Sequence, residues 1–447
     1  MRKSHPGQKD RLSGKCPGQL RNPPSENKQG VKTMKGLKFK VLGLSLLVLL
    51  APSALFSQFN RQDWRVSQIA SDLTVGYAVH ICDLNGDGKA DVLILDSRRI
   101  VAFYGPDFKP TEIARDFAKP DLVCITSLDI DGDGRLDLVV GADWKPFNTK
   151  SGGTIQWLRQ PGKEGEKWTV TPITEEPTIH RIKTADLDGD GKPEVIAVAL
   201  MGYEASAKAN WMDGRPVRVL SLKPGANPKS DPWLVQSLDQ SLHVVHNFLP
   251  IKEPGKDPFV ITASYEGLGR LVLNKKGLEG KVVPLHAGNQ EKPSSNRGAS
   301  EVARGKNTSG NEMFATVEPW HGNQIVAYEQ NPNKLWTRTV LDEQLKWGHA
   351  VSIADLDNDG VDEVIAGIRD NLSENPGKRR GVRIYRRNKV DPSQWMVFVL
   401  EDGGVAVEDL VIGDLDGDGL KDIVVSGRAT QNARIYFQNP QKPNRLK

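Results

Sequence analysis

Short apolar runs follow clusters of Asp, Asn and Gly at several points along the chain. Five such segments superimpose without gaps and read DLNGDGKADVLI, DIDGDGRLDLVV, DLDGDGKPEVIA, DLDNDGVDEVIA and DLDGDGLKDIVV, beginning at Asp83, Asp129, Asp186, Asp355 and Asp414. Apolar runs of four to six residues bounded by turn formers predict β-strands. The chain therefore carries an internal repeat in which an Asp-rich loop leads into a strand.

The spacing of these segments predicts seven repeats. Their intervals are 46, 57, 169 and 59 residues, and 169 is about three times the others, so two repeats with degraded loops should lie between Asp186 and Asp355. Residues 246–264 contain PFVITAS, which matches PEVIAVA of the third repeat, and residues 298–318 contain the second candidate.

Each repeat reads as four strands, and the fourth opens with tryptophan in WTVTPI, WLVQSL, WTRTVL and WMVFVL. A fifth copy, WRVSQI at Trp64, precedes the first repeat, whereas the last repeat stops after its third strand at Asn439. The N-terminal strand should complete the last repeat and close a ring, which removes the open sheet edge. We predict an all-β, seven-bladed β-propeller over residues 60–440. The tryptophans are expected to pack between blades, with a ligand-stacking platform as the alternative.

Composition and charge narrow the function classes. Residues 1–57 hold 11 Lys and Arg against 2 acidic residues, which leaves 49 basic and 54 acidic residues in the remainder. This mildly acidic part has no basic stripe, so nucleic acid is excluded as a partner. Cys82 and Cys124 fall within strand patterns and are expected to be unpaired core residues. We expect a monomer.

The N-terminal region has the layout of a secretory signal over residues 34–57. Lys35, Lys38 and Lys40 precede the apolar run of residues 41–50, and small residues follow. We therefore expect export to a secreted or periplasmic location. The alternative is an uncleaved anchor, the only route by which a membrane would be a partner. Residues 1–33 are interpreted as a non-native extension or a disordered tail, and residues 441–447 as a C-terminal tail.

The Asp-rich loops have the ligand chemistry of calcium sites. Carboxylates or amides recur at positions 1, 3, 5 and 9, and a glycine at position 6 permits a sharp turn. About five structural Ca²⁺ ions are predicted, since the crowded carboxylates would otherwise repel one another. The predicted ligands are Asp83, Asn85, Asp87, Asp91, Asp129, Asp131, Asp133, Asp137, Asp186, Asp188, Asp190, Glu194, Asp355, Asp357, Asp359, Glu363, Asp414, Asp416, Asp418 and Asp422. Solvated acidic turns without an ion are the alternative.

The face opposite these loops gathers a second set of candidate residues, because the first strand of every repeat begins there. Counting back from each loop gives mostly His and Glu, and the loops between the second and third strands add Trp and His. Imidazoles that converge on the axis with carboxylates can form a transition-metal site or a general acid/base pair. The alternative is that each histidine only caps a neighbouring loop. The residues are Tyr77, Trp144, His180, His246, Glu301, Trp320, His321 and His349.

The repeat resembles the FG-GAP and VCBS family of calcium-bearing propellers, which includes the integrin α-subunit head. The resemblance covers residues 60–440 and implies the fold and the calcium sites. The chain lacks the Phe-Gly opening of the integrin pattern, and only Gly141, Ala142 and Asp143 approximate its Gly-Ala-Pro ending.

The segments GASE, EPWHGN and GHA, which begin at Gly298, Glu318 and Gly348, are similar to those in the propeller domain of the aldos-2-ulose dehydratase family. This family eliminates water from keto sugars in a metal-bearing cleft. The resemblance implies a divalent metal at the axis held by His180, His246 and His349. It also implies proton transfer by Glu301 or His321 and sugar stacking by Trp320. Trp144, Tyr77 and Arg369 are further candidates for substrate binding on this face. The chain has no room for the cupin and lectin-like domains of the fungal enzyme.

Two classes of function follow from these residues. The first is an exported carbon–oxygen lyase that dehydrates keto sugars, and the second is a non-catalytic propeller that binds a glycan or a protein. A third interpretation, a polysaccharide lyase, would use Tyr77 and Arg369 in the cleft.

Overall fold

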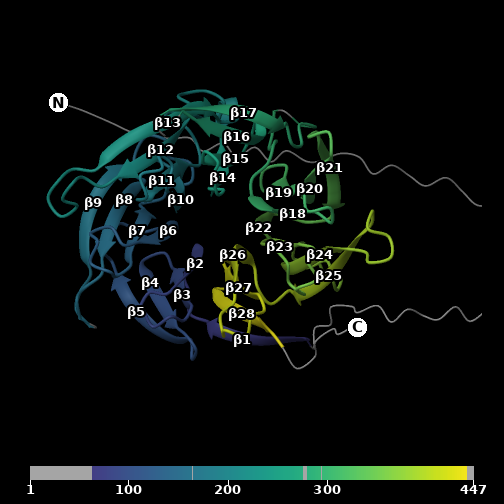
Figure 1. Ribbon diagram of the computed structural model, residues 1–447, viewed down its shortest axis with the longest axis horizontal. Coiled ribbons are helices and arrows are strands. Elements are labelled where there is room, and N and C mark those ends of the chain that lie inside the picture. Colours follow the sequence, from purple (N-terminus) through teal and green to yellow (C-terminus); the bar gives the residue numbers. More distant parts are fainter. Residues whose placement is uncertain (1–62, 164, 275–278, 293, 440–447) are drawn as a thin grey trace, which may run out of the picture. The chain divides into compact units, whose positions relative to one another are not determined.

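The computed structural model describes residues 63–439, apart from 164, 275–278 and 293. These residues fold as a ring of seven four-stranded antiparallel sheets, one for each predicted repeat (Figure 1). The ring confirms the predicted seven-bladed β-propeller. The predicted signal at 34–57 and the segments 1–33 and 441–447 lie outside the described residues. Within the described part of the chain, no helix has the length and hydrophobicity of a bilayer-spanning segment.

Each blade runs outward from the axis in chain order, and only the last blade departs from this order. The innermost strands are β2 (Ala78–Cys82), β6 (Cys124–Leu128), β10 (Ile179–Ala185), β14 (Val245–Ile251), β18 (Val302–Lys306), β22 (Gly348–Ala354) and β26 (Val407–Gly413). The second strands are β3 (Asp91–Leu95), β7 (Asp137–Ala142), β11 (Glu194–Ala199), β15 (Phe259–Ser264), β19 (Glu312–Glu318), β23 (Glu363–Ile368) and β27 (Asp422–Gly427).

The third and fourth strands complete the blades. The third strands are β4 (Arg99–Tyr104), β8 (Thr154–Arg159), β12 (Val217–Lys223), β16 (Gly267–Leu273), β20 (Gln324–Gln330), β24 (Gly381–Arg387) and β28 (Asn432–Gln438). The outermost strands are β5 (Lys109–Arg115), β9 (Thr169–Glu175), β13 (Leu234–Leu242), β17 (Gly280–His286), β21 (Trp336–Asp342), β25 (Trp395–Asp402) and β1 (Trp64–Ala70). One 3-10 turn, η2 (Ala207–Ala209), lies in the β11–β12 loop.

The core consists of layers between neighbouring blades. The second strands are buried on both faces because each blade packs against the next one, which explains their uninterrupted apolar runs. The tryptophans that mark the outermost strands lie in these layers. Trp168, Trp233, Trp336 and Trp395 each pack against apolar side chains of the preceding blade. The expected packing role of the tryptophans is thus observed.

The first strand closes the ring. β1 pairs antiparallel with β28, from Trp64 opposite Gln438 to Ala70 opposite Ala433, and so forms the outer edge of the last blade. Trp64 is 6% exposed and packs with Leu356, Val382 and Tyr436 of the last two blades. The predicted exchange of a strand between the two ends of the repeat array is therefore confirmed.

Cys82 and Cys124, the cysteines within the described residues, are free thiols, Cys124 being buried and Cys82 half-buried. Burial raises the pKa of both thiols to about 12, so both are protonated at neutral pH. The prediction of unpaired cysteines is confirmed.

If β1 closes the ring by packing, shortening a buried side chain of β1 should destabilise the protein more than shortening an exposed one. Replacing Trp64→Ala should lower the free energy of unfolding by about 3–5 kcal/mol, since it removes a large side chain from a packed layer. Val66→Ala is the matched control on the same strand, because Val66 is 43% exposed and should cost less than about 0.5 kcal/mol. Urea denaturation followed by tryptophan fluorescence measures both, and equal costs would contradict the packing of Trp64.

Candidate functional site

Histidines from several blades meet on the axis of the ring. His180 lies in β10, His246 in β14 and His349 in β22, all innermost strands, whereas His321 lies in the β19–β20 loop. The ring centroids of His246 lie 4.5, 4.5 and 5.1 Å from those of His180, His321 and His349. Because innermost strands converge, residues far apart in the sequence occupy one cluster, which we call the axial histidine cluster.

Three of these imidazoles are arranged like a metal-binding set. One ring nitrogen from each of His246, His321 and His349 lies within 4.8 Å of the other two. The Nε2 atoms of His246 and His321 are 2.7 Å apart. This separation is that of a hydrogen bond, in which one ring donates its N–H and the other ring nitrogen accepts it. The donor type of the three nitrogens and their grouping within 4.8 Å fit a divalent metal held by neutral imidazoles.

Electrostatics keep the cluster neutral. The pKa values of all four histidines lie well below 6.5, primarily because burial disfavours the charged ring, and neighbouring arginines, Arg181 and Arg369 foremost, lower them further. Both ring nitrogens of His180 are buried without a hydrogen-bond partner. A neutral imidazole keeps a lone pair on one ring nitrogen, which can bind a metal or accept a proton.

Glu301 lies beneath the cluster, just before β18. Its Oε1 is 2.6 Å from His246 Nδ1 and 3.2 Å from Arg181 Nη2, and Asn247 donates a hydrogen bond to its Oε2. Burial raises the pKa of the Glu301 carboxyl above its ordinary value, and the positive charge of the neighbouring Arg181 opposes part of this rise. A carboxylate on the far nitrogen of a ligand histidine fixes the ring and raises its basicity. Glu301 is therefore placed to orient His246.

A second carboxylate holds the other side of the cluster. Glu408 in β26 accepts hydrogen bonds from Arg428 at 2.7 Å and Arg369 at 3.3 Å, and its backbone carbonyl lies 2.5 Å from His349 Nδ1. The Arg428 guanidinium carbon lies 5.3 Å from the centre of the Tyr77 ring. Arg369, named for the polysaccharide-lyase interpretation, thus anchors Glu408.

Aromatic side chains line the same end of the axis. Trp320 stacks on His321 with ring centroids 4.0 Å apart, and Trp144 stacks on His180 at 5.8 Å. Tyr77 contacts Trp144 edge-on at 6.0 Å. The structure therefore brings together all the residues that the sequence placed on this face.

The backbone of this face is strained at several loop positions. His321, Asp143 and Trp347 adopt φ values of 51°, 53° and 58°, and Trp211 adopts 62°. Left-handed φ at non-glycine residues costs free energy and is enriched at functional sites.

Sequence reasoning missed Arg181, Asn247, Arg428 and Trp347. Arg181 and Asn247 directly follow His180 and His246, so the residue after each axial histidine was a signal that could have been used. Arg428 stands at the repeat position of Arg369, the first residue after the second strand of its blade, and this correspondence could have identified it. No signal in the sequence singles out Trp347.

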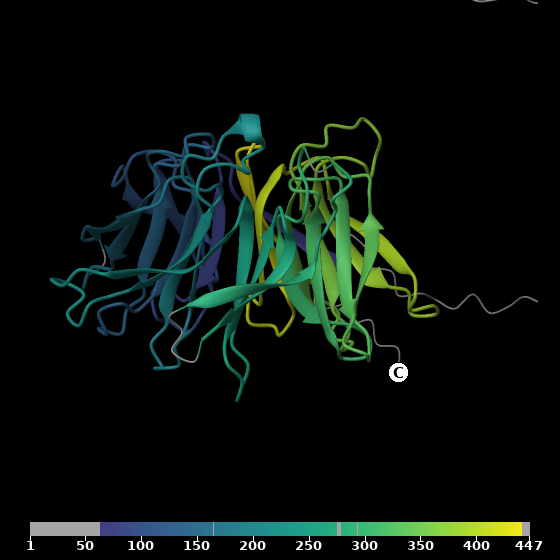
Figure 2. The ribbon, with the colours of Figure 1, turned by 90° about the horizontal axis from the view of Figure 1, so that it is seen from above.

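The Asp-rich loops lie at the other ends of the strands, which run between the two faces of the ring (Figure 2). Four of the five loops bring three carboxylate oxygens within 4.8 Å of one another: Asp129, Asp131 and Asp133; Asp186, Asp188 and Glu194; Asp355, Asp357 and Asp359; Asp414, Asp416 and Asp422. The first loop, at Asp83, does not reach this geometry among the described residues.

Charge crowding in these loops is marked. Burial and neighbouring carboxylates raise the pKa of Glu363 to about 8 and that of Asp422 to about 7. Buried carboxylate oxygens of Asp131, Asp137 and Asp357 have no hydrogen-bond partner. Unpartnered carboxylate oxygens in a tight turn fit a hard divalent cation.

Comparisons with known proteins bear on both faces. Residues 152–331 match the family model of the β-propeller domain of aldos-2-ulose dehydratase. Residues 83–140 match that of an FG-GAP-like repeat, and residues 125–156 that of an FG-GAP repeat. The aldos-2-ulose dehydratase of Phanerodontia chrysosporium is 27% identical over 261 residues. These residues are 53% of this chain and 27% of that protein, so the chain spans about a quarter of its relative.

Solved structures show the same fold. Two structures of BBS1N in complex with ARL6DN, soaked with lead and with mercury, superimpose with TM-scores of 0.52 and 0.50 at 14% identity. They cover 86% and 85% of this chain and 99% and 98% of theirs.

The depressed pKa of His180 predicts a pH-dependent stability. Above pH 6.5 the ring is neutral in both the folded and the unfolded chain. Below pH 6.5 only the unfolded chain binds the proton, so stability falls as pH falls toward the folded pKa. Between pH 7.5 and 5.5, with chelator present, the native chain should lose about 1.4 kcal/mol more than His180→Asn. Urea denaturation at both pH values tests this expectation, which equal losses would contradict.

Proposed function

We propose that this seven-bladed propeller with FG-GAP-like repeats is an exported sugar dehydratase whose axial histidine cluster removes water from a keto sugar. The observation that carries the proposal is the convergence of four neutral imidazoles from separate blades, three of them buried and that of His321 half-buried. The similarity to the aldos-2-ulose dehydratase propeller supports a sugar as substrate. Carbohydrate is accordingly the proposed partner.

His246, His321 and His349 would hold the divalent metal in this function. When bound, such an ion would polarise the carbonyl of the sugar and acidify the adjacent C–H bond. Glu301 and the backbone carbonyl of Glu408 keep the ring planes of His246 and His349 fixed by contacting their Nδ1 atoms. His321 thus moves from the predicted proton-transfer role to the ligand set.

His180 is the proposed proton carrier. It lies outside the group of three, and its two ring nitrogens have no partner. As a neutral base it would take the proton from the carbon next to the carbonyl, and the imidazolium would return that proton to the departing hydroxyl. The products are an unsaturated ketone and one water, so atoms and charge balance.

Trp320 and Trp144 are proposed to position the sugar ring. They flank the cluster from two blades, and each stacks on one of its histidines. Both indoles are half-buried, and apolar C–H faces of sugars pack on such rings. On the side of the cluster formed by β26, Arg369 and Arg428 pair with Glu408 and neutralise its charge. This side therefore does not repel the oxygen atoms of a sugar.

Calcium in the Asp-rich loops is proposed to be structural. The carboxylate groups around Asp131, Asp188, Asp357 and Asp416 support a hard oxygen-ligated ion in at least four loops. Lys223 and Lys389 donate to carboxylates of two of these loops, for example to Asp188 at 2.7 Å and Asp359 at 2.8 Å. Such lysines would compete with the ion for these oxygens.

The metal proposal predicts a selective loss of one ion. After dialysis, elemental analysis of the native protein should give about one transition-metal ion per chain beside calcium. His246→Ala/His349→Ala should lose that ion and keep its calcium. His180→Asn should retain the metal but lower kcat on aldos-2-uloses by about 10²–10³, the typical contribution of a general acid or base.

A native protein without transition metal and without turnover of keto sugars would overturn the dehydratase proposal. It would favour a propeller that only binds a glycan, which the half-buried tryptophans Trp144 and Trp320 could still serve.

The calcium proposal predicts loss of one ion in Asp357→Asn, together with about 3 kcal/mol of stability at saturating calcium. Glu253→Gln is the matched control, because Glu253 lies in the corresponding β14–β15 loop, which has no Asp repeat. The control should bind as many calcium ions as the native chain. Isothermal titration of EGTA-treated protein gives the counts, and equal counts in all three proteins would contradict this assignment.

A further inference from the structure

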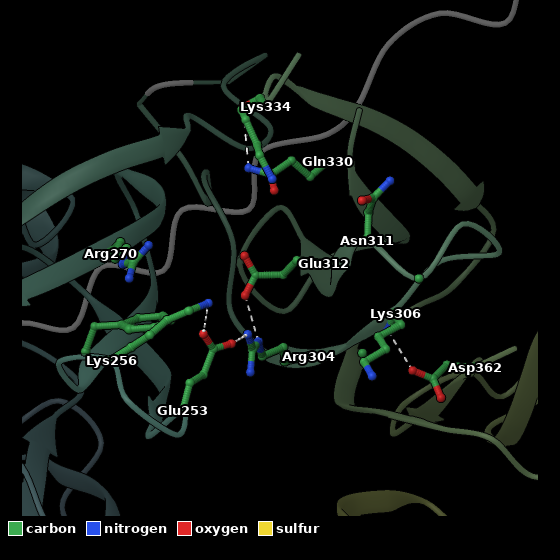
Figure 3. A pocket seen from close by; sticks show the side chains of 13 residues that line it. Glu253, Lys256, Arg270, Arg304, Lys306, Asn311, Glu312, Gln330, Lys334 and Asp362 are labelled. Carbon is green, nitrogen blue, oxygen red and sulfur yellow. Dashed lines mark hydrogen bonds and ion pairs between the residues drawn. The ribbon is translucent and has the colours of Figure 1, made fainter. Parts of the chain in front are cut away.

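A cavity of about 780 Å³ opens between the fourth and fifth blades. Its walls come from the β14–β15 and β18–β19 loops, strand β16, the β20–β21 loop and Asp362 of the sixth blade (Figure 3). All these loops lie at the face of the Asp-rich loops, away from the axial histidine cluster. The cavity is therefore independent of the proposed dehydratase site.

The cavity coincides with the two blades that lack the Asp repeat. The β18–β19 connection spans residues 307–311, whereas the equivalent connection of the sixth blade spans residues 355–362. A shorter hairpin leaves space beside the neighbouring loops. Its length is too small for the nine-residue acidic pattern of the other blades.

In the fifth blade an arginine of the innermost strand pairs with the acidic residue that opens the second strand. Glu312 begins β19, as Glu363 begins β23 and Asp422 begins β27. The Nε atom of Arg304 donates to Glu312 Oε1 at 2.7 Å, and its Nη2 pairs with Glu253 from the fourth blade. The floor of the cavity is thus an internal ion-pair network.

Three further cations line the cavity with no acidic partner among the described residues. They are Arg270 of β16, Lys306 of β18 and Lys334 of the β20–β21 loop. The Arg270 guanidinium lies 3.6 Å from the centre of the Phe259 ring, and its Nε is buried without a hydrogen-bond partner. Stacking holds the guanidinium plane in a fixed orientation, as in sites that recognise oxyanions.

The whole lining carries five cations against three acidic groups, although the part of the chain beyond residue 57 has more acidic than basic residues. Asn311 and Gln330 add side-chain amides. A positive concave site with amide donors suits a ligand that combines an oxyanion with hydroxyl groups.

We propose that this cavity binds an anionic saccharide, whose carboxylate, sulfate or phosphate group is held by Arg270, Lys306 and Lys334. The volume is within the range of small-molecule sites. Arg270 would contact the oxyanion directly, and the two lysines at the rim would steer it in. Glu312 and Asp362 would remain with Arg304 and the Lys306 backbone amide, their partners in the structure.

Calorimetric titration with inorganic sulfate, inorganic phosphate and glucuronate at constant ionic strength tests the site and distinguishes the three oxyanions. We expect saturable binding of at least one probe. Arg270→Gln and Lys306→Gln should each weaken its binding about tenfold or more, the usual effect of removing one charge-assisted hydrogen bond. Lys163→Gln is the matched control, since Lys163 is exposed on the β8–β9 loop of another blade and should bind like the native chain.

The thermal midpoint and the metal content of Arg270→Gln should equal those of the native protein, which separates loss of binding from loss of fold. The proposal is overturned if none of the probes binds saturably, or if Lys163→Gln weakens binding as much as Arg270→Gln. Because the axial histidine cluster is unchanged in these variants, failure here leaves the dehydratase proposal standing.

Discussion

The pairing of β1 with β28 is the constraint on which the remaining structure depends. The last blade has four strands like the others only because β1, from the beginning of the array, pairs with β28. Closure fixes the angle between neighbouring blades, and this angle brings the innermost strands β10, β14 and β22 around one axis (Figure 1). The axial histidine cluster is therefore a consequence of ring geometry, since its members share no stretch of sequence.

The two faces divide the chemistry of the molecule. At one face, strands begin with histidine and glutamate, and strained loops add aromatic rings such as Trp320 and Trp347. At the other, hairpins carry carboxylates that crowd one another and raise their own pKa values. Both sets arise in the same way, because one position of the repeat recurs in several blades around the ring. The fold thus places side chains of the same chemical type at the same height along the axis.

Most of the fold could be predicted because a repeat shows itself in the sequence. The gap of 169 residues between two Asp-rich loops predicted two further blades, and the match of PFVITAS to PEVIAVA helped to place β15 although its blade has no Asp-rich loop. The position of His180, His246 and His349 relative to these loops also predicted their convergence. The proximity of His321 to His246 and His349 could not be predicted, since it depends on a left-handed loop residue at 321. The ion pairs of Arg304 could not be predicted either. They join Glu253 of the fourth blade to Glu312 of the fifth, and the blades concerned have no Asp-rich motif.

That network makes the ring chemically uneven. If calcium balances the charge of the other loops, most of the propeller depends on an ion that can leave, whereas the arc from β14 to β21 contains its own cation in Arg304. Depletion of free calcium would then loosen the ring from the far side first. Hydrogen exchange would spread toward this arc from both directions, and the fourth and fifth blades would be the last part of the molecule to open.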